Sequence, residues 1–445
     1  MLALLYGRQV TQEQLTNLSI DDAADKLVKR QAVLIKKNFV QCQRCGSLTP
    51  KKVCALPNKQ YYCPKCLLFG RLTTSDILYS IPEPHDFPKP ISPILTAVPK
   101  LSKWQALCAK ELVTIWKKQG THLLWAVTGA GKTEILFEVI KEALKAKQRI
   151  CLAAPRVDVC VELAPRIKQA FAHTKISVLY GNSHQPYRYT QLVICTVHQL
   201  FNFYQAFDLL ILDETDAYPF IGDKQLHFAV ANACCKRATK IFLTATPDKN
   251  LKRQVAQKKL TLSYLPLRYH RFPLPEAKII LVSDLLANFR RQKLAEKLKN
   301  YFAKWFKNEV QFLVFVPQVN WLGPVLLCLQ QIFPQLKGTS VHANDENRLA
   351  KVKAFRAKEY DYLVTTTILE RGITIKNVNV IVLAADSPKF SQTALVQIAG
   401  RVGRNSAYPC GDVIFCCEEV SLSVLAAKFQ IKHANQRAKK LLVHE

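Results

Sequence analysis

A glycine-rich stretch of the chain has the residue types needed to bind nucleotide phosphates. The stretch Ala126–Thr133 reads Ala-Val-Thr-Gly-Ala-Gly-Lys-Thr, and it lies between an apolar run and a segment of helical character. Glycines let backbone N–H groups approach phosphate oxygens, and a following helix N-terminus adds a favourable dipole. We expect Lys132 to contact the β- and γ-phosphates of ATP and Thr133 to bind Mg²⁺. The predicted nucleotide-binding residues here are Thr128, Gly129, Ala130, Gly131, Lys132 and Thr133.

An acidic pair follows a second apolar run. Asp213 and Glu214 come directly after Leu209–Leu212. If that run is a parallel strand, its carboxyl end is where open α/β sheets bind ligands. We expect Asp213 to hold Mg²⁺ and Glu214 to orient and deprotonate the attacking water. The glycine-rich stretch and the acidic pair together predict ATP hydrolysis.

Two arginines near the end of the chain suit the same reaction. Gln397–Arg404 reads Gln-Ile-Ala-Gly-Arg-Val-Gly-Arg. A planar guanidinium can hold γ-phosphate oxygens and offset the charge that develops in the transition state. We therefore predict that Arg401 and Arg404 are arginine fingers and that Gln397 contacts the nucleotide. Taken alone, the motif is also compatible with a basic helix start on a solvated surface.

Three weaker patterns supply further candidates. Thr244 and Thr246 follow an apolar run, and their hydroxyls are candidates for joining the acidic pair to a second lobe. In the stretch Thr365–Thr374, hydroxyls and charge are expected to grip a DNA phosphate, although threonines also cap strands. Gln105 can read an adenine edge with its amide, or can simply be a solvated residue at a helix start. The candidates for coupling or DNA contact are Thr244, Thr246, Thr366, Thr367 and Arg371.

A cysteine cluster near the start of the chain has the spacing of a zinc site. Two Cys-x-x-Cys pairs are separated by a stretch long enough to form two knuckles around one tetrahedral ion. The predicted Zn²⁺ ligands are Cys42, Cys45, Cys63 and Cys66, and Cys54 between them is interpreted as a bystander. Buried free cysteines are the alternative. Basic residues surround the cluster, which favours DNA contact or docking as its role.

The elements that must position these residues are short apolar strands alternating with helices. Such runs predict an α/β fold with parallel sheets covered on both faces. We expect residues 1–80 to contain the zinc module, 81–100 to be a proline-rich linker, and 101–270 and 271–445 to form two RecA-like lobes in tandem. The predicted strands are His122–Val127, Arg149–Ala154, Leu192–Thr196, Phe207–Leu212, Lys240–Leu243, Lys278–Ser283, Gln311–Val316, Tyr360–Thr365, Val378–Ala384 and Asp412–Cys417.

The charge of the chain favours a polyanionic partner. Lys and Arg number 63 against 33 Asp and Glu, a formal net charge of +30 spread along the sequence. Such an excess suits a groove that follows nucleic acid, with an anionic membrane surface as a second possibility. No secretory signal is recognised, and the uncharged stretch Phe312–Leu336 is interrupted by prolines, so we interpret it as a strand and a helix. The cysteines are expected to be reduced in a cytoplasmic protein.

The ordered set of motifs matches superfamily 2 helicases and translocases, and the chain resembles one family more closely. The four cysteines before the phosphate loop, Asp213–Phe220 and Thr365–Gly372 are similar to the ComFA family of late-competence proteins. The resemblance implies an ATPase stimulated by single-stranded DNA that uses ATP, Mg²⁺ and Zn²⁺ and helps draw transforming DNA into the cytoplasm. It also implies a peripheral location at the inner face of the cell membrane. The implied partners are the membrane DNA-uptake channel, a phosphoribosyltransferase-like competence protein and the strand-loading protein of recombination. A second copy of the chain is a further candidate partner, which the resemblance does not itself imply.

Two other functions remain open at this point. A primosome-type helicase of replication restart shares the motifs, but its additional cysteine pairs lie between motifs of the second lobe. An ATP-switched adaptor at the uptake channel would need little motion along DNA. The presence of Glu214, Arg401 and Arg404 favours an active ATPase over such a switch.

Overall fold

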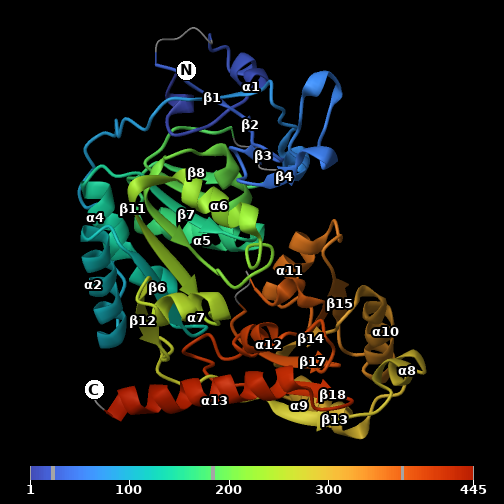
Figure 1. Cartoon of the computed structure of the whole chain (residues 1–445). Coiled ribbons are helices and arrows are strands. Elements are labelled where there is room, and N and C mark those ends of the chain that lie inside the picture. Colours follow the sequence, from blue (N-terminus) through green and yellow to red (C-terminus); the bar gives the residue numbers. More distant parts are fainter. Residues whose placement is uncertain (1, 22–25, 182–185, 372–374, 444–445) are drawn as a thin grey trace. The chain divides into compact units, whose positions relative to one another are not determined.

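The computed structural model describes residues 2–21, 26–181, 186–371 and 375–443, and these form two compact units (Figure 1). The first unit comprises Met1–Trp125 and Lys132–Ser263. The second comprises Ala126–Gly131 and Tyr264–Glu445. We call the glycine-rich stretch Ala126–Thr133 the phosphate loop. Its residues Ala126–Gly131 group with the second unit, whereas Lys132 and Thr133 belong to the first.

The first unit contains a seven-stranded sheet of order β12-β6-β11-β10-β7-β9-β8. Neighbouring strands from β6 to β8 run parallel. Every residue of β7 and β9 is buried, so both faces of the sheet are covered, as predicted. The strands are β6 (Thr121–Ala126), β7 (Ile150–Ala154), β8 (Ile176–Leu179), β9 (Leu192–Thr196), β10 (Phe207–Leu212), β11 (Cys234–Thr244) and β12 (Thr261–Leu265). The helices are α2 (Lys103–Lys117), α3 (Lys132–Ile135), α4 (Phe137–Lys145), α5 (Val157–Ala170), α6 (Lys224–Ala233) and α7 (Lys249–Ala256).

The second unit contains a six-stranded sheet of order β13-β18-β17-β14-β16-β15, parallel throughout. Its central strands β14, β16, β17 and β18 are buried at every residue. The strands are β13 (Lys278–Leu281), β14 (Gln311–Phe315), β15 (Gly338–Val341), β16 (Tyr362–Thr365), β17 (Val378–Leu383) and β18 (Val413–Cys417). The helices are α8 (Leu285–Arg290), α9 (Glu296–Lys307), α10 (Leu322–Ile332), α11 (Arg348–Arg356), α12 (Gln392–Ala399) and α13 (Leu422–Val443).

The two sheets confirm the predicted α/β architecture. Every strand predicted from the sequence is present, and the ends agree within two residues except at the predicted Lys240–Leu243, where β11 begins at Cys234. The uncharged stretch Phe312–Leu336 forms most of β14 and all of α10, also as predicted. Among the helices in the described part of the chain, none has the length and apolar character needed to cross a membrane.

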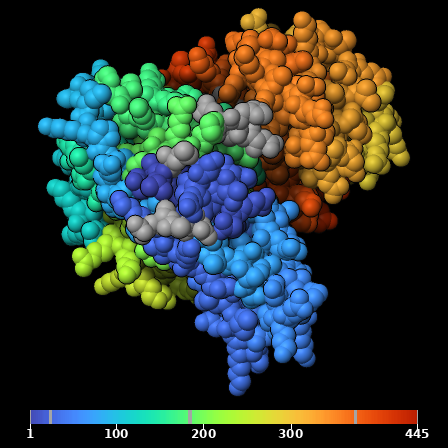
Figure 2. All heavy atoms as spheres, turned by 90° about the horizontal axis from the view of Figure 1, so that it is seen from above, coloured from blue at the N-terminus to red at the C-terminus, as the bar shows by residue number. Residues whose placement is uncertain are grey.

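The N-terminal region belongs to the first unit. It contains α1 (Gln12–Asn17) and the antiparallel pair β1 (Val28–Gln31) and β5 (Ile77–Ser80). It also contains a three-stranded antiparallel sheet of β2 (Val33–Ile35), β3 (Phe39–Cys42) and β4 (Leu48–Pro50). Figure 2 shows the blue atoms of this region packed against the green atoms of the same unit. One buried cluster joins residues of β3 with Phe203, Leu226 and Ala229, so the region shares its core with the first lobe.

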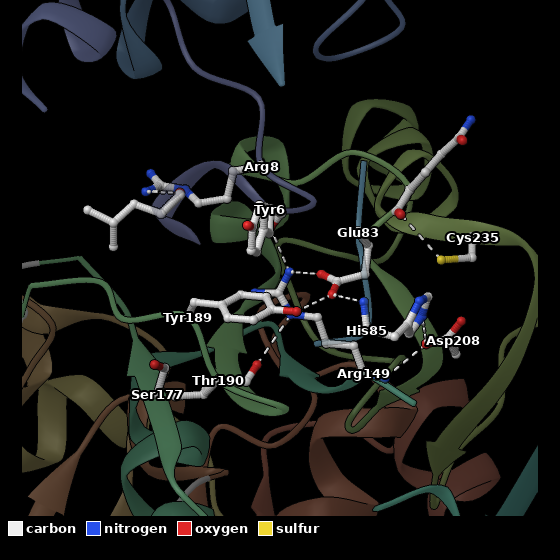
Figure 3. Close-up of polar contacts among 12 residues, drawn as sticks. Tyr6, Arg8, Glu83, His85, Arg149, Ser177, Tyr189, Thr190, Asp208 and Cys235 are labelled. Carbon is white, nitrogen blue, oxygen red and sulfur yellow. Dashed lines mark hydrogen bonds and ion pairs between the residues drawn. The ribbon is translucent and has the colours of Figure 1, made fainter. Parts of the chain in front are cut away.

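A buried ion pair also holds the start of segment 81–100, directly after the N-terminal region, on the first lobe (Figure 3). The Arg149 and Glu83 side chains are 0% and 2% exposed, and their Nη1 and Oε2 atoms lie 2.7 Å apart. Arg149 Nη1 also donates to the Tyr6 carbonyl at 2.8 Å, and the Tyr189 hydroxyl donates to Glu83. Beside them His85 Nε2 lies 2.7 Å from Asp208 Oδ2. The Asp208 carboxylate raises the pKa of His85 against the opposing effect of burial.

Replacing Glu83 with Gln is expected to destabilise the first unit by about 3–5 kcal/mol, because it leaves the Arg149 charge buried without its partner. The measurement is urea unfolding of the full-length chain at neutral pH. Glu142→Gln is the matched control, because Glu142 pairs with Lys145 on the surface of the same unit. Exposed ion pairs of this kind contribute little to stability, so this substitution is expected to leave the free energy of unfolding nearly unchanged. Equal effects of the two substitutions would show that the buried pair does not anchor this segment on the first lobe.

Candidate functional site

The phosphate loop has the backbone geometry that anion binding requires. It follows β6, and Gly129 and Gly131 have φ values of +78° and +72°. Residues with side chains rarely adopt this left-handed conformation, so glycine is needed at both positions. Lys132 begins α3, with its side chain half-buried, and Thr133 is buried beside it. The loop therefore delivers Lys132 and Thr133 at the carboxyl end of β6, where the sequence placed them.

The acidic pair lies at the carboxyl end of β10, a strand inside the same sheet. The Asp213 backbone N–H donates to the Ala153 carbonyl at 2.9 Å, and the Glu214 N–H donates to Asp213 Oδ1 at 2.8 Å. Burial raises the pKa of Asp213 to about 6, and the Lys132 ammonium opposes that rise. Lys132 and Asp213 therefore interact electrostatically within the first unit. The set Thr133, Asp213 and Lys132 offers a hydroxyl, a carboxylate and a cation, which fits a magnesium–polyphosphate ligand.

Glu214 has a backbone conformation that is costly for a residue with a side chain. Its φ is +51°, in the left-handed region. The turn is fixed on both sides, because the Thr215 N–H donates to the Leu243 carbonyl at 3.2 Å and the Ala217 N–H donates to the Glu214 carbonyl at 2.9 Å. Strained conformations of this kind persist where the surroundings hold them, and they are frequent at functional sites. The geometry agrees with the catalytic role predicted for Glu214, which stays a prediction.

Asp216 is a site residue that no sequence motif singled out. Thr244 Oγ1 donates to Asp216 Oδ1 at 2.7 Å, and the Thr246 hydroxyl donates to its other carboxylate oxygen. All three side chains are buried. The predicted link of the two threonines to the acidic motif thus runs through Asp216, and their coupling to the second lobe remains a prediction. The signal for Asp216 was present in its position three residues after Asp213, at the end of the Asp-Glu-Thr-Asp turn.

Gln105 takes part in a helix cap. Its Oε1 accepts the Ser102 backbone N–H at 2.8 Å, and its own N–H donates to Ser102 Oγ at 3.3 Å. This reciprocal arrangement is a capping box at the start of α2. Gln105 is buried, so it is not the solvated residue that was the alternative. The adenine contact remains a prediction, although the Gln105 side-chain carbonyl already accepts the Ser102 N–H.

The turn Thr366–Arg371, here called the threonine-rich turn, follows β16 in the second unit. Thr366 and Thr367 are half-buried, whereas Arg371 is 1% exposed. Arg371 Nε lies 3.4 Å from Glu370 Oε1, so its charge is directed into the turn. Residues 372–374 of the predicted motif lie outside the described residues. The DNA contacts assigned to Thr366, Thr367 and Arg371 stay predictions, and for Arg371 the burial favours a supporting role.

The turn Gly400–Arg404, here called the arginine turn, follows α12 in the second unit. Gln397 and Arg401 are buried, and Arg401 Nε donates to the Glu370 carbonyl at 3.1 Å. Arg404 is half-buried, with its Nε donating to the Gly400 carbonyl at 3.0 Å. Arg401 is thus held against the threonine-rich turn. Arg404 retains more exposure, which suits a contact with a ligand.

The four predicted zinc ligands converge in the N-terminal region of the first unit. Their sulfur atoms all lie within 4.8 Å of one another, and all four residues are buried. Cys42 Sγ is 3.7 Å from Cys66 Sγ, and Cys45 Sγ is 3.6 Å from Cys63 Sγ. A Zn–S bond of about 2.3 Å places tetrahedral sulfurs about 3.8 Å apart, so the set fits Zn²⁺. Cys54 lies outside this set and points its thiol at the Pro50 carbonyl, as expected for a bystander.

The residues around the cysteines support a metal–thiolate site. Arg44 is buried, and its Nε donates to Cys66 Sγ at 3.4 Å, which stabilises negative charge on sulfur. Gly46 has a φ of +70°, and a Cβ built there would lie 2.3 Å from the Phe228 ring of α6. The first zinc knuckle therefore packs directly on a helix of the first lobe.

Three family models match successive parts of the chain. The N-terminal domain of competence protein ComFA matches residues 1–80, the res subunit of type III restriction enzymes matches 99–249, and the helicase conserved C-terminal domain matches 293–406.

Curated relatives match nearly the whole chain. "Competence protein ComFA" of Bacillus subtilis is 39% identical over 419 residues, covering 93% of this chain and 90% of the relative. The protein of the same name from Streptococcus pneumoniae is 38% identical over 432 residues, covering 97% and 98%. A solved structure of "DEAD-box helicase Mss116 bound to ssRNA and UDP-BeF" has a TM-score of 0.58 at 18% identity, over 72% of this chain and 71% of that one. That likeness supports the fold of two RecA-like lobes.

Proposed function

Because the chain belongs to the ComFA family of competence proteins, we propose that it is an ATP-dependent single-stranded DNA translocase that helps drive transforming DNA into the cytoplasm. The observation that carries the proposal is that Lys132 and Asp213 follow strands β6 and β10 at the same carboxyl edge of the first-unit sheet, where the Lys132 ammonium opposes the rise in the pKa of Asp213. That edge combines a phosphate loop, a carboxylate for Mg²⁺ and a carboxylate for water. The combination is the minimum set for phosphoryl transfer to water.

The residues divide the hydrolysis reaction among them. Lys132 binds the β- and γ-phosphates, and Thr133 and Asp213 would hold Mg²⁺, which when bound neutralises phosphate charge. Glu214 accepts a proton from the water whose oxygen attacks the γ-phosphorus, and the bond to the β–γ bridging oxygen breaks to release ADP. Arg401 and Arg404 offset the charge on the γ-phosphate oxygens in the transition state.

The predicted DNA partner is supported by charge. The net charge of +30 favours a polyanion, and contacts with phosphates are sequence-independent. Family membership then supports single-stranded DNA over RNA. A second copy of the chain is a further proposed partner. Family membership also supports the proposal of the membrane uptake channel, the phosphoribosyltransferase-like competence protein and the strand-loading protein of recombination as partners. It supports action at the inner face of the cell membrane as well.

The test is ATP turnover of the full-length protein titrated with single-stranded DNA, duplex DNA and RNA at one stated salt concentration. We expect single-stranded DNA to stimulate turnover most, and ATP to drive displacement of a roadblock bound to that DNA. Stimulation without displacement would indicate the ATP-switched adaptor. Unwinding of a forked duplex would indicate the primosome-type helicase.

A further inference from the structure

A short segment of the second unit is hydrogen-bonded to the phosphate loop. The segment runs from Leu265, at the end of β12, to His270, and it precedes β13. The Val127 N–H donates to the Leu265 carbonyl at 3.1 Å, and the Tyr269 N–H donates to the Gly129 carbonyl at 3.0 Å. Two backbone contacts thus fix this segment against the loop residues that group with the same unit.

The same segment contacts the arginine turn. Arg268 Nη2 donates to the Val402 carbonyl at 2.9 Å, and His270 Nε2 lies 2.9 Å from the Gly403 carbonyl. The Ser406 N–H donates to the Tyr269 hydroxyl at 3.1 Å. Leu265–His270 therefore lies between two of the motifs that the sequence assigned to ATP, although it has no recognisable motif of its own.

Arg268 is the residue in this segment whose own hydrogen-bonding capacity is unfilled. Its side chain is 1% exposed, yet its Nε and Nη1 atoms have no hydrogen-bond partner among the described residues. A Cβ built on Gly129 would lie 2.9 Å from Nε, and one built on Gly403 would lie 3.2 Å from Nη1. The guanidinium is thus enclosed by two glycine backbones. Buried charged donors without partners cost free energy, so the arrangement requires an explanation.

The electrostatics around Arg268 favour an anion. Burial, together with the nearby Arg404 guanidinium, lowers the pKa of Arg268 to about 10. Two buried or half-buried cations at one place repel each other unless negative charge lies between or beside them. A further polar group also favours a bound ligand here. Thr128 Oγ1 in the loop is buried and has no hydrogen-bond partner in the described structure.

We propose that Arg268 is a phosphate-binding residue of the nucleotide site, whose free donors bind oxygens of the ATP polyphosphate held by the loop. The inference rests on the proposed ATPase function and adds to it a third arginine, supplied by the segment that joins the two sheets. The occupant is a polyphosphate because the unfilled donors face the glycine loop, whose geometry is that of a phosphate cradle. Arg suits this role because it keeps its charge when buried and donates several directed hydrogen bonds.

The test compares Arg268→Gln with wild type and with Arg271→Gln, which changes the exposed arginine directly after the segment. We expect Arg268→Gln to raise the KM for ATP about tenfold or more. It should also reduce the rise in Tm that a non-hydrolysable ATP analogue produces, while the Tm without nucleotide changes little. Arg271→Gln should leave both quantities unchanged. Arg404→Ala should instead lower kcat more than it weakens ATP binding, as expected of a finger.

A purely structural role for Arg268 gives the opposite pattern. In that case Arg268→Gln lowers the Tm without nucleotide and leaves both the ATP-induced rise and the KM unchanged, which would overturn the inference. Arg268→Lys keeps the charge with fewer directed donors, and an intermediate KM is expected even if the Gln variant does not fold. A wild-type protein without ATP turnover would instead refute the proposed function, so the two failures are distinguishable.

Discussion

Replacing Lys132 with Ala is expected to reduce ATP turnover at least about 100-fold, equivalent to about 2.7 kcal/mol of transition-state stabilisation. The reason is that Lys132 is the cation that follows the two left-handed glycines, and its ammonium interacts with Asp213 at the edge of the sheet. Without it the γ-phosphate loses a direct positive contact, and Asp213 loses the charge that opposes the rise in its pKa. Steady-state hydrolysis with saturating single-stranded DNA measures the effect.

Binding of DNA should survive this change. The charge that attracts DNA is spread along the chain, so fluorescence anisotropy with labelled single-stranded DNA is expected to give an affinity close to that of wild type at equal salt. Lys145→Ala is the matched control, since Lys145 lies in α4 of the same unit and pairs with Glu142 on the surface, away from the loop and the acidic pair. It should leave turnover unchanged. Normal turnover in Lys132→Ala would remove the basis for the phosphate-loop assignment.

Replacing Cys42 with Ser is expected to release zinc and to destabilise the whole first unit. Zinc binding to four-ligand sites of small modules contributes on the order of 10 kcal/mol of folding free energy at neutral pH. Here that free energy is not confined to a small module, because Cys42 and Cys45 belong to the same buried cluster as Phe203 and Leu226. Metal content per chain, measured on purified full-length protein, should fall from one zinc to none, together with a lower Tm.

Cys54→Ser is the control for this experiment. Cys54 is as buried as the ligands and lies between them in sequence, but its thiol contacts the Pro50 carbonyl. The Cys54→Ser variant should therefore retain one zinc ion per chain. If the Cys42 variant is insoluble, chelator-driven release of zinc from wild type gives the same stoichiometry without any substitution. Stoichiometric zinc in a Cys42/Cys45 double variant would exclude the proposed ligand set.

The sequence predicted the centre of each sheet better than its edges. The unpredicted strands of the two lobes are β8, β12 and β15, and each stands at the end of its sheet. An edge strand has one neighbour and is partly exposed, so it lacks the continuous apolar run that marks a buried strand. In β12 the first two residues are exposed, and in β15 three of the four residues are half-buried.

The sequence likewise predicted some residues of the candidate site and missed others. Residues that sit inside a motif, such as Lys132 and Asp213, were predictable because the spacing alone carries the chemistry. Arg268 was not, because its role depends on hydrogen bonds to residues more than a hundred positions away, such as Val402. Asp216 lay between these cases. Its position in the acidic turn was visible, but its bonds to Thr244 and Thr246 arise only when β10 and β11 pair.

The contact of Gly46 with Phe228 has a consequence for how this protein can be dissected. A chain cut within residues 81–100 would leave the zinc knuckle and α6 on different fragments. A cut after Glu83 would also leave Glu83 and Arg149 on different fragments. Each fragment would then present half of a shared interior to water and would tend to aggregate. The thiols and the ATP motifs are therefore best tested by point substitutions in the intact chain, since inactivity of a truncated one would report on exposed core and not on zinc.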